Sequence, residues 1–535
     1  MGTTLKEPRL SLIHTESGAK NYISIPPIIM KKVYSLGTLK NLEDGVSFSI
    51  KNPVKDALIT ELAGVSINGL EIALEDVSMS SDGICLKAVE VSPDRPLPFP
   101  MGQDVEFHVR TMALAKNTEH AITISCHTDL YGMLDLEAGD SVIETRETKR
   151  KMPYDKLNNY DMDIVRQRQD FMEEYTGTHF HHIKQHSFDP ILTKGNIENF
   201  TGVAQIPLGF AGPLRVNGEH AKGEFFIPMC TSEGTLVASY NRGMKLINMC
   251  GGVKVTVVED HMQRSPAFAF DSAREGRDFM LWIDEHMDEI RRHAESASKV
   301  AKLLTIEKYV ASRLVYLRFN YYTGDAAGQN MVSMCTFTAC NWILSQVNTV
   351  RHFYLDGNIS TDKKASFINN LITRGKRVIG EILIPKEVMI KHMRVDPVTL
   401  DYLCRACQIG AFMAGASSNG LHAANALAAI FMATGQDVAN VSESSAGMVC
   451  TEITPEGDLY GSLTLTSLIV ATYGGGTGLP TQRECLESLD CYGQGKVLKF
   501  AEIVAAAATA GEISLAGAIA SLDWVTSHER LGKNR

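Results

Sequence analysis

Four side chains spread over residues 233–528 have types and surroundings suited to proton transfer and charge stabilisation. Glu233 lies among small residues in MCTSEGTLVASYNRG, where burial would favour a protonated carboxyl group that can donate a proton. Lys363 stands in STDKKASF, and its ammonium group suits the stabilisation of an oxyanion. Asp437 follows an apolar segment and a glycine, where a buried aspartate could pair with a lysine. His528 supplies an imidazole, the side-chain type suited to proton transfer at neutral pH. Capping, surface or tail positions would also explain each of them, so none identifies a reaction by itself.

Two loops of small residues could bring the backbone close to a ligand. One is ATYGGGTGLPTQ, which contains Gly475 and Gly476, and the other is GDAAGQNMVS, which follows a predicted strand. Small residues in the second loop could cradle a phosphate or a nicotinamide ring. No G-x-G-x-x-G string follows a predicted strand, so the sequence argues against an orthodox dinucleotide-binding fold.

Two other patterns invite a metal or redox interpretation. Cys404 and Cys407 form one C-x-x-C pair, but no second pair follows at the spacing of a zinc site. Histidines gather between residues 179 and 186 without a carboxylate or cysteine at ligand spacing. We therefore predict no metal site. The cysteines number eleven and are scattered, which predicts reduced thiols.

The composition is that of a folded, acidic protein. Of its 535 residues 44% are hydrophobic and 21% are charged, which excludes disordered, collagen-like and coiled-coil chains. The 52 basic and 62 acidic residues give a net charge of −10, which argues against a nucleic-acid or anionic membrane partner. No apolar run reaches about 18 residues, and the first residues lack the apolar core of a signal peptide. The sequence thus predicts a cytoplasmic protein without a membrane span.

The elements that must position these side chains fall into two parts. Residues 40–130 read as short alternating segments broken by Gly, Pro, Asn and Asp, which predicts a small all-β domain. Its strings DVSMSSDG and PMGQDVEFHV faintly resemble a PilZ-type barrel, although that family's arginine motif is not visible. We expect residues 1–150 to form an accessory docking or structural domain. From residue 190, Gly- and Ala-rich helices alternate with β-branched strands, which predicts an α+β fold.

From about residue 190 to its end, the chain resembles the 3-hydroxy-3-methylglutaryl-coenzyme A (HMG-CoA) reductase family. The resemblance covers roughly two thirds of the chain, and the matching strings follow the family's order. They are ENFTG, PLGFAGPL, PMCTSEGTLVASYNRG, GDAAGQNMVSM, TDKKASFINNLITRGK, LHAANALAAIFMATGQDVAN, YGGGTGLPTQ and AGEISLAGAIASLDWVTSH.

The resemblance implies a class I-like catalytic region behind the β domain. Residues 151–200 would form its helical N-terminal segment. A large substrate-binding domain would comprise residues 201–265 and 366–535, with a small ferredoxin-like NADP-binding domain inserted at 266–355. Residues 356–365 would be the connecting loop that carries Lys363.

By the same resemblance Glu233, Lys363, Asp437 and His528 match the family's catalytic residues. The implied reaction is the reduction of HMG-CoA to mevalonate and coenzyme A by two hydride transfers from NADPH. Lys363 would stabilise the thioester oxyanion, His528 would protonate the leaving thiolate, and Glu233 would protonate the aldehyde oxygen. Asp437 would keep the lysine charged and the glutamate protonated.

The resemblance also implies binding residues. Those matched to the substrate are Arg264, Lys364, Arg405, His422, Asn425, Ser239, Asn241 and Arg242. Those matched to the cofactor are Ser298, Lys299, Asp325, Gly328, Asn330, Met331, Gly475 and Gly476. Ala327 and Gln329 stand where methionines are usual, and Arg405 stands where a lysine is usual. Lys299 replaces an arginine that reads the 2′-phosphate of NADPH, and it keeps the charge without the bidentate geometry.

The partners and the alternatives follow from the same comparison of strings. ENFTG resembles the family's dimer motif, which implies a homodimer with an active site shared between subunits and leaves a tetramer open. Two alternatives to the reductase stay open: NAD-dependent oxidation of mevalonate on the same fold, and a non-catalytic acyl-CoA-binding scaffold. The four retained catalytic residue types favour the reductase.

Overall fold

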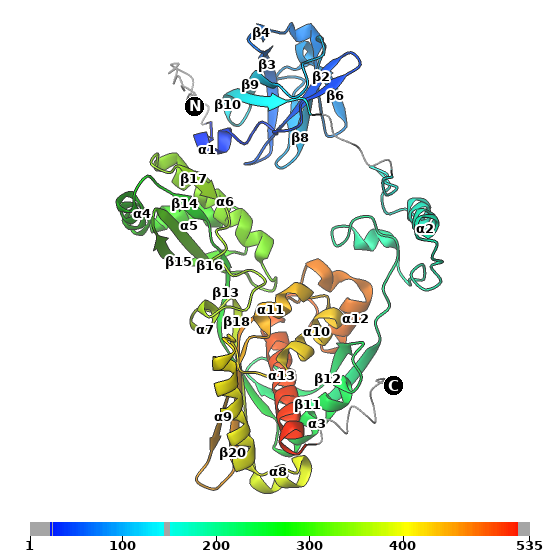
Figure 1. Ribbon diagram of the computed structural model, residues 1–535, viewed down its shortest axis with the longest axis vertical. Coiled ribbons are helices and arrows are strands. Elements are labelled where there is room, and N and C mark those ends of the chain that lie inside the picture. Colours follow the sequence, from blue (N-terminus) through cyan, green and yellow to red (C-terminus); the bar gives the residue numbers. More distant parts are fainter. Residues whose placement is uncertain (1–21, 24, 144–149, 523–535) are drawn as a thin grey trace. The chain divides into compact units, whose positions relative to one another are not determined.

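The computed structural model describes residues 22–23, 25–143 and 150–522 (Figure 1). The main division of the chain falls after residue 147 and separates a smaller N-terminal unit from a larger C-terminal unit. The N-terminal unit consists mainly of strands, and the C-terminal unit mixes helices with strands.

The N-terminal unit is built from two antiparallel sheets that follow a short helix, α1 (Pro27–Met30). The first has the order β1 (Lys40–Leu42), β2 (Gly45–Lys51), β8 (Asp104–Val109), β5 (Val77–Ser81) and β6 (Ile84–Lys87). The second has the order β10 (Gly132–Ser141), β9 (Glu119–Thr128), β3 (Ala57–Ile67) and β4 (Leu70–Glu71), with β7 (Leu97–Phe99) paired to β3. Buried and exposed residues alternate along β9 and β10, as expected for strands with one face on a core. The small β domain predicted from this alternation is confirmed.

The C-terminal unit begins with α2 (Met162–Thr176) and the loops around it. Arg168 of this helix is fully buried, and its guanidinium donates to the carbonyl oxygens of Pro153, Asn159 and Phe200 at 2.9–3.0 Å. A buried guanidinium requires such partners, so Arg168 fixes α2 to the ENFTG string that contains Phe200.

A large sheet forms the scaffold of the C-terminal unit. β13 (Val253–Arg264), β18 (Gly375–Ile384), β20 (Leu459–Leu468) and β19 (Gly447–Ile453) pair antiparallel in that order. β11 (Leu208–Gly218) pairs with β12 (Lys222–Cys230) and runs parallel to β13. The helices around this sheet are α3 (Leu236–Met249), α8 (Lys386–Met393), α9 (Pro397–Met413), α10 (Ala423–Thr434), α12 (Pro480–Ser488) and α13 (Val497–Ala520).

Helix α13 is the centre of this core (Figure 1, red). It contacts α3, α10, β13 and β18, and most of its residues are buried. It approaches α3 so closely that a Cβ on Gly243 would lie 2.0 Å from the carbonyl oxygen of Ala510. Glycine at position 243 is therefore required by packing, since any side chain there would overlap the backbone of α13.

A smaller subdomain continues from the end of β13. The last residues of this strand pair with β16 (Leu314–Tyr322), which also pairs with β15 (Lys302–Ala311) and β14 (Ala267–Ala269). β17 (His352–Tyr354) completes this part of the sheet. Its helices are α4 (Ala273–Glu285), α5 (Met287–Glu295) and α6 (Gln329–Gln346). Because β13 belongs to both parts, Arg264 at its end lies where the small subdomain joins the large sheet.

In the described part of the chain, α13 is the one helix that is long and apolar enough to cross a membrane by length and composition. The sequence predicted no membrane span here, because the apolar stretch over residues 503–510 is short and bounded by polar residues. In its most apolar window 78% of the residues are buried inside the unit. The buried core helices of soluble proteins are often as long and as apolar, so the length and composition of α13 are weak evidence for a membrane span.

Candidate active site

The structure brings Lys363 and Asp437 together. The Nζ atom of Lys363 lies 3.0 Å from Oδ2 of Asp437, and both side chains are about half exposed. Asp437 follows Gly435, the left-handed residue that ends α10, and its carboxylate also accepts from the backbone N–H of Ala439 at 3.1 Å. The hydrogen bond that the Lys363 amine donates to Asp437 is the largest cause that raises the pKa of Lys363. The amine is therefore held in its charged form.

The loop that carries Lys363 has an unusual backbone. Three non-glycine residues within six positions, Asn358, Thr361 and Lys363, have φ values of 68°, 58° and 57°. Such left-handed conformations are strained for residues with a Cβ and persist where neighbouring contacts hold them. The hydroxyl of Thr361 bonds to Oδ1 of Asn369 at 2.9 Å, and the N–H of Lys363 donates to Oε1 of Glu443 at 3.0 Å.

Glu443 and Arg374 lie beneath this loop, and both are fully buried. Arg374 contacts Oε1 of Glu443 at 3.4 Å through Nε and forms an ion pair with Asp362. Burial raises the pKa of Glu443, and the nearby Arg374 opposes that shift. Neither residue was predicted from the sequence to belong to the site. The one available signal was the position of Glu443 six residues after Asp437, in a string that reads as a polar surface.

Glu233 lies in the loop between β12 and α3 and is exposed. Our expectation that it would be buried is wrong for a single chain, since nothing described covers the tip of this loop. Asn425, near the start of α10, donates to the Oε2 atom of Glu233 at 3.3 Å. Within the described residues of one chain, no hydrogen bond or ion pair joins Glu233 to Lys363 or Asp437.

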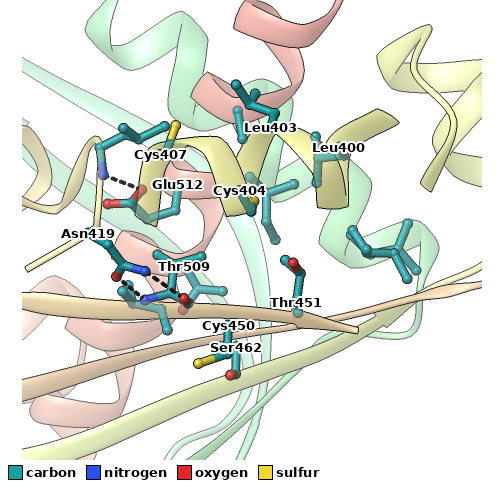
Figure 2. Close-up of a pocket in the computed structure, with 18 residues that line it drawn as sticks. Leu400, Leu403, Cys404, Cys407, Asn419, Cys450, Thr451, Ser462, Thr509 and Glu512 are labelled. Carbon is teal, nitrogen blue, oxygen red and sulfur yellow. Dashed lines mark hydrogen bonds between the residues drawn. The ribbon is translucent and has the colours of Figure 1, made fainter. Parts of the chain in front are cut away.

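His422 stands at the start of α10 and is buried against Tyr240, with ring centroids 5.0 Å apart. Burial lowers the pKa of His422 to about 4, so its ring is neutral at physiological pH. Its backbone N–H donates to Oε1 of Glu512 at 2.7 Å, and the same carboxylate accepts from Leu421 and Ala423. Figure 2 shows Glu512 at the wall of an apolar pocket beneath α9, where it holds the chain that leads into His422.

The residues matched to the coenzyme A end of the substrate lie on α3. Ser239 and Arg242 both bond to Ser514 of α13, at 3.0 and 3.1 Å to its hydroxyl. Asn241 accepts from the N–H of Gly212 at 2.7 Å and lines a surface hollow together with Lys245.

The remaining residues matched to the substrate lie in separate places. Arg264 pairs with Asp356 and also donates to the carbonyl oxygen of Gln329 at 3.3 Å. Lys364 is exposed, and its amine donates to the carbonyl oxygen of Asp362 at 2.9 Å. Arg405 is exposed on α9, where it pairs with Asp401 at 2.7 Å. No described hydrogen bond or ion pair links Arg405 to the Lys363 loop.

Among the residues matched to the cofactor, Asp325 is a structural link. Its carboxylate accepts from the N–H groups of Gly495, Lys496 and Val497 at 2.8–3.2 Å, which caps the start of α13. Its carbonyl oxygen accepts from Thr472 at 3.0 Å, so the GDAAGQNMVS loop is tied to the strand end that leads into the glycine loop.

The other matched cofactor residues lie in the same loops or at the end of α5. Gly328 (φ +84°) and Gly475 (φ +57°) are left-handed, and a Cβ on Gly476 would lie 2.5 Å from the carbonyl oxygen of Gly435. Asn330 and Met331 form the first turn of α6. Ser298 accepts from the N–H of Ala301 at 3.1 Å, and Lys299 beside it is exposed. His528 lies outside the described residues.

One described group has a geometry that could hold a metal ion, namely Glu219, His220 and Glu502. The buried Glu502 carboxylate accepts from the N–H groups of Glu219, His220 and Ala221 at 2.6–3.0 Å. These bonds explain the carboxylate as an anchor for the turn between β11 and β12, so we assign no metal to it.

Comparison with known protein families covers both units of the chain. The family described as hydroxymethylglutaryl-coenzyme A reductase matches residues 164–533. The family described as the N-terminal domain of hydroxymethylglutaryl-CoA reductase matches residues 29–143. The chain belongs to the hydroxymethylglutaryl-coenzyme A reductase family. The resemblance noted in the sequence analysis began only near residue 190, so it missed that the β domain is also part of this family.

Other members of the reductase family are similar to most of the chain. The 3-hydroxy-3-methylglutaryl-coenzyme A reductase of Pyrococcus horikoshii is 41% identical over 376 residues, which covers 68% of this chain and 91% of that protein. The enzyme of the same name from Methanocaldococcus jannaschii is 42% identical over 373 residues and covers 68% of this chain and 92% of that protein.

Solved reductases from Streptococcus pneumoniae share the fold. One has a TM-score of 0.50 at 18% identity and covers 62% of this chain and 88% of its own. A class II reductase from the same organism, bound to NADPH in open conformations, has a TM-score of 0.50 at 19% identity. At this identity the likeness concerns the reductase fold alone.

Proposed function

We propose that this chain reduces HMG-CoA to mevalonate and coenzyme A, with NADPH as the hydride donor in both steps. The observation that carries the proposal is the 3.0 Å ion pair between Lys363, in the strained connecting loop, and Asp437, in the turn after α10. A charged amine fixed in this way can stabilise the oxygen of a thioester carbonyl as it gains negative charge. The membership of the reductase family supports this substrate and this reaction.

The protons would come from the other two matched residues. His528 would protonate the leaving thiolate, since an imidazole titrates near neutral pH. Glu233 would protonate the aldehyde oxygen in the second reduction, with its carboxylate held by Asn425. His422 is neutral and buried, so it would shape the site beside the reacting centre and carry no charge.

The cofactor would lie against the two loops of small residues. Asp325 ties these loops together, and Gly328 and Gly476 leave no room for a Cβ beside Thr323 and Gly435. Exposed Lys299 supplies a positive charge suited to the 2′-phosphate of NADPH, which favours NADPH over NADH. The ferredoxin-like character of the small subdomain and the proposed domain limits remain predictions.

We also propose a homodimer whose active sites are shared between subunits. In one chain Glu233 is exposed and not bonded to the Lys363 pair. Helix α9 presents exposed apolar side chains, among them Tyr402, Ile409, Phe412 and Met413. A second copy would cover such a face and would bring its own polar groups to the exposed sites.

An assay of reduced-nicotinamide consumption with HMG-CoA tests the proposed function. We expect turnover with NADPH and at least tenfold lower kcat/KM with NADH. Lys363→Ala should lower kcat by about a thousandfold or more, because it removes the positive charge that would stabilise the oxyanion. Its oligomeric state should be unchanged. An NADH preference would support mevalonate oxidation instead, and full activity of Lys363→Ala would refute the assigned role.

A further inference from the structure

We infer that a closed ring of five side chains beneath the connecting loop positions Lys363 for the reaction proposed above. The ring consists of Gln329, Asp362, Arg374, Asn440 and Glu443. The inference rests on the proposed function, because the ring serves the amine of Lys363 and performs no chemistry of its own.

Each member of the ring contacts the next. Oε1 of Glu443 accepts from Nδ2 of Asn440 at 2.9 Å, and Oδ1 of Asn440 accepts from Nε2 of Gln329 at 3.1 Å. The same amide of Gln329 donates to Oδ1 of Asp362 at 3.2 Å. Asp362 forms an ion pair with Nη2 of Arg374, and Nε of Arg374 lies 3.4 Å from Oε1 of Glu443. This last contact closes the ring.

The ring joins four segments that are far apart in the sequence. Gln329 begins α6 at the end of the GDAAGQNMVS loop, and Asp362 directly precedes Lys363. Arg374 precedes β18, and Asn440 and Glu443 follow Asp437 in the turn and in the short helix α11 (Val441–Ser444). The ring therefore bonds three segments of the proposed site to one another: the GDAAGQNMVS loop, the loop that carries Lys363, and the turn that follows Asp437.

Burial makes this arrangement rigid. Arg374 and Glu443 are fully buried, and Asn440 is almost so. A buried charge that loses its partner is strongly destabilised, so none of the four segments can shift without breaking the others' bonds. Gln329 is one of the positions where this chain departs from the methionine usual in the family. Its amide makes two of the ring's bonds, which a methionine thioether could not donate.

The ring acts on Lys363 through Glu443. Oε1 of Glu443 accepts the backbone N–H of Lys363 at 3.0 Å, at the residue whose φ of 57° is strained. Without this acceptor the backbone would relax toward an ordinary conformation, and the amine would leave Asp437. The charged groups that surround Lys363 are Asp437, Asp362 and Glu443. Glu443 is fully buried and bonds to the backbone N–H of Lys363, so it is a positioning residue.

Glu443→Gln tests the inference, because it keeps the shape of the side chain and removes the negative charge that pairs with Arg374. We expect kcat to fall at least tenfold while KM for HMG-CoA and for NADPH changes less than threefold.

Gln329→Met should lower kcat less, since it removes two bonds and leaves Glu443 in place. Glu502→Gln is the matched control: it also neutralises a buried carboxylate that accepts three N–H groups, but at the β11–β12 turn. Its kcat should stay within twofold of the parent's.

A second measurement does not depend on turnover. Mass spectrometry can follow how fast an amine-reactive reagent modifies Lys363 relative to Lys391, an exposed lysine on α8. We expect the ratio of these two rates to rise at least threefold in Glu443→Gln and to stay unchanged in Glu502→Gln. An unchanged ratio in Glu443→Gln would overturn the inference, whether or not the enzyme turns over. The inference would also be overturned if Glu502→Gln and Glu443→Gln lowered Tm equally and lowered kcat by the same factor. A parent chain inactive with HMG-CoA would instead refute the proposed function, and the labelling ratio would still test the ring.

Discussion

At the scale of single residues, the candidate site consists of a half-exposed ion pair and a buried ion pair beneath it. Lys363 and Asp437 are half exposed and charged, whereas Glu443 and Arg374 below them are buried and paired. The exposed pair is available to a ligand, and the buried pair holds the backbone. His422 is the third case, a titratable side chain that burial keeps neutral.

His422 gives a prediction about stability and pH. Its pKa in the folded chain is about 4, below the ordinary value of 6.5, so the unfolded chain takes up a proton first as the pH falls. Stability from this residue is complete above pH 6.5 and is lost as the pH falls toward 4, by up to about 3 kcal/mol. Denaturant unfolding of the parent and of His422→Gln between these pH values measures it. The variant should show a flatter pH dependence, and parallel curves would contradict the assignment.

At the scale of elements, the contact of α3 with α13 determines where Ser239, Asn241 and Arg242 stand. Ser239 and Arg242 are bonded to Ser514 of α13, and Tyr240 packs against both His422 and Gly511. A shift of α3 would therefore move the residues proposed to contact coenzyme A together with His422.

Gly243→Ala tests this contact. The added methyl group would lie 2.0 Å from the carbonyl oxygen of Ala510, so the helices must separate. We expect a loss of about 2–4 kcal/mol of unfolding free energy, measured in denaturant, and a raised KM for HMG-CoA. Gly64→Ala in β3 is the control, because a Cβ there meets no atom within 4 Å. Equal stability of the two variants would show that α3 and α13 are not packed so closely.

At the scale of the whole molecule, the proposed sharing of the active site between subunits can be tested by mixing two inactive chains. Glu233→Ala and Lys363→Ala each remove one half of the proposed site. If the halves come from different subunits, a mixed dimer has one intact site, and equal mixing with subunit exchange restores about one quarter of parental activity. Activity assays after unfolding and refolding the mixture measure this. No recovery in a mixture shown to contain mixed dimers would mean that one chain supplies the whole site.

The sequence by itself predicted the local elements and the family resemblance, because both depend on residue types and their order along the chain. The alternating pattern over residues 40–130 predicted the β domain, because period-two burial is a local property of strands. Asp437 follows the glycine that ends α10 and pairs with a lysine, as the sequence suggested, but it is about half exposed where a buried aspartate was expected. The family assignment of residues 164–533 agrees with the resemblance of those strings. The PilZ likeness and the cytoplasmic location remain predictions.

Only the tertiary structure decided which charges are buried and which are exposed. Glu443 meets the Lys363 backbone across 80 positions, and Asn425 meets Glu233 across 192. A charged side chain has the same local sequence signal on a surface and in a core, because its burial depends on what remote segments pack against it. For this reason Glu233 was expected inside and lies outside, while Glu443 and Arg374 were overlooked and form the buried base of the Lys363 loop.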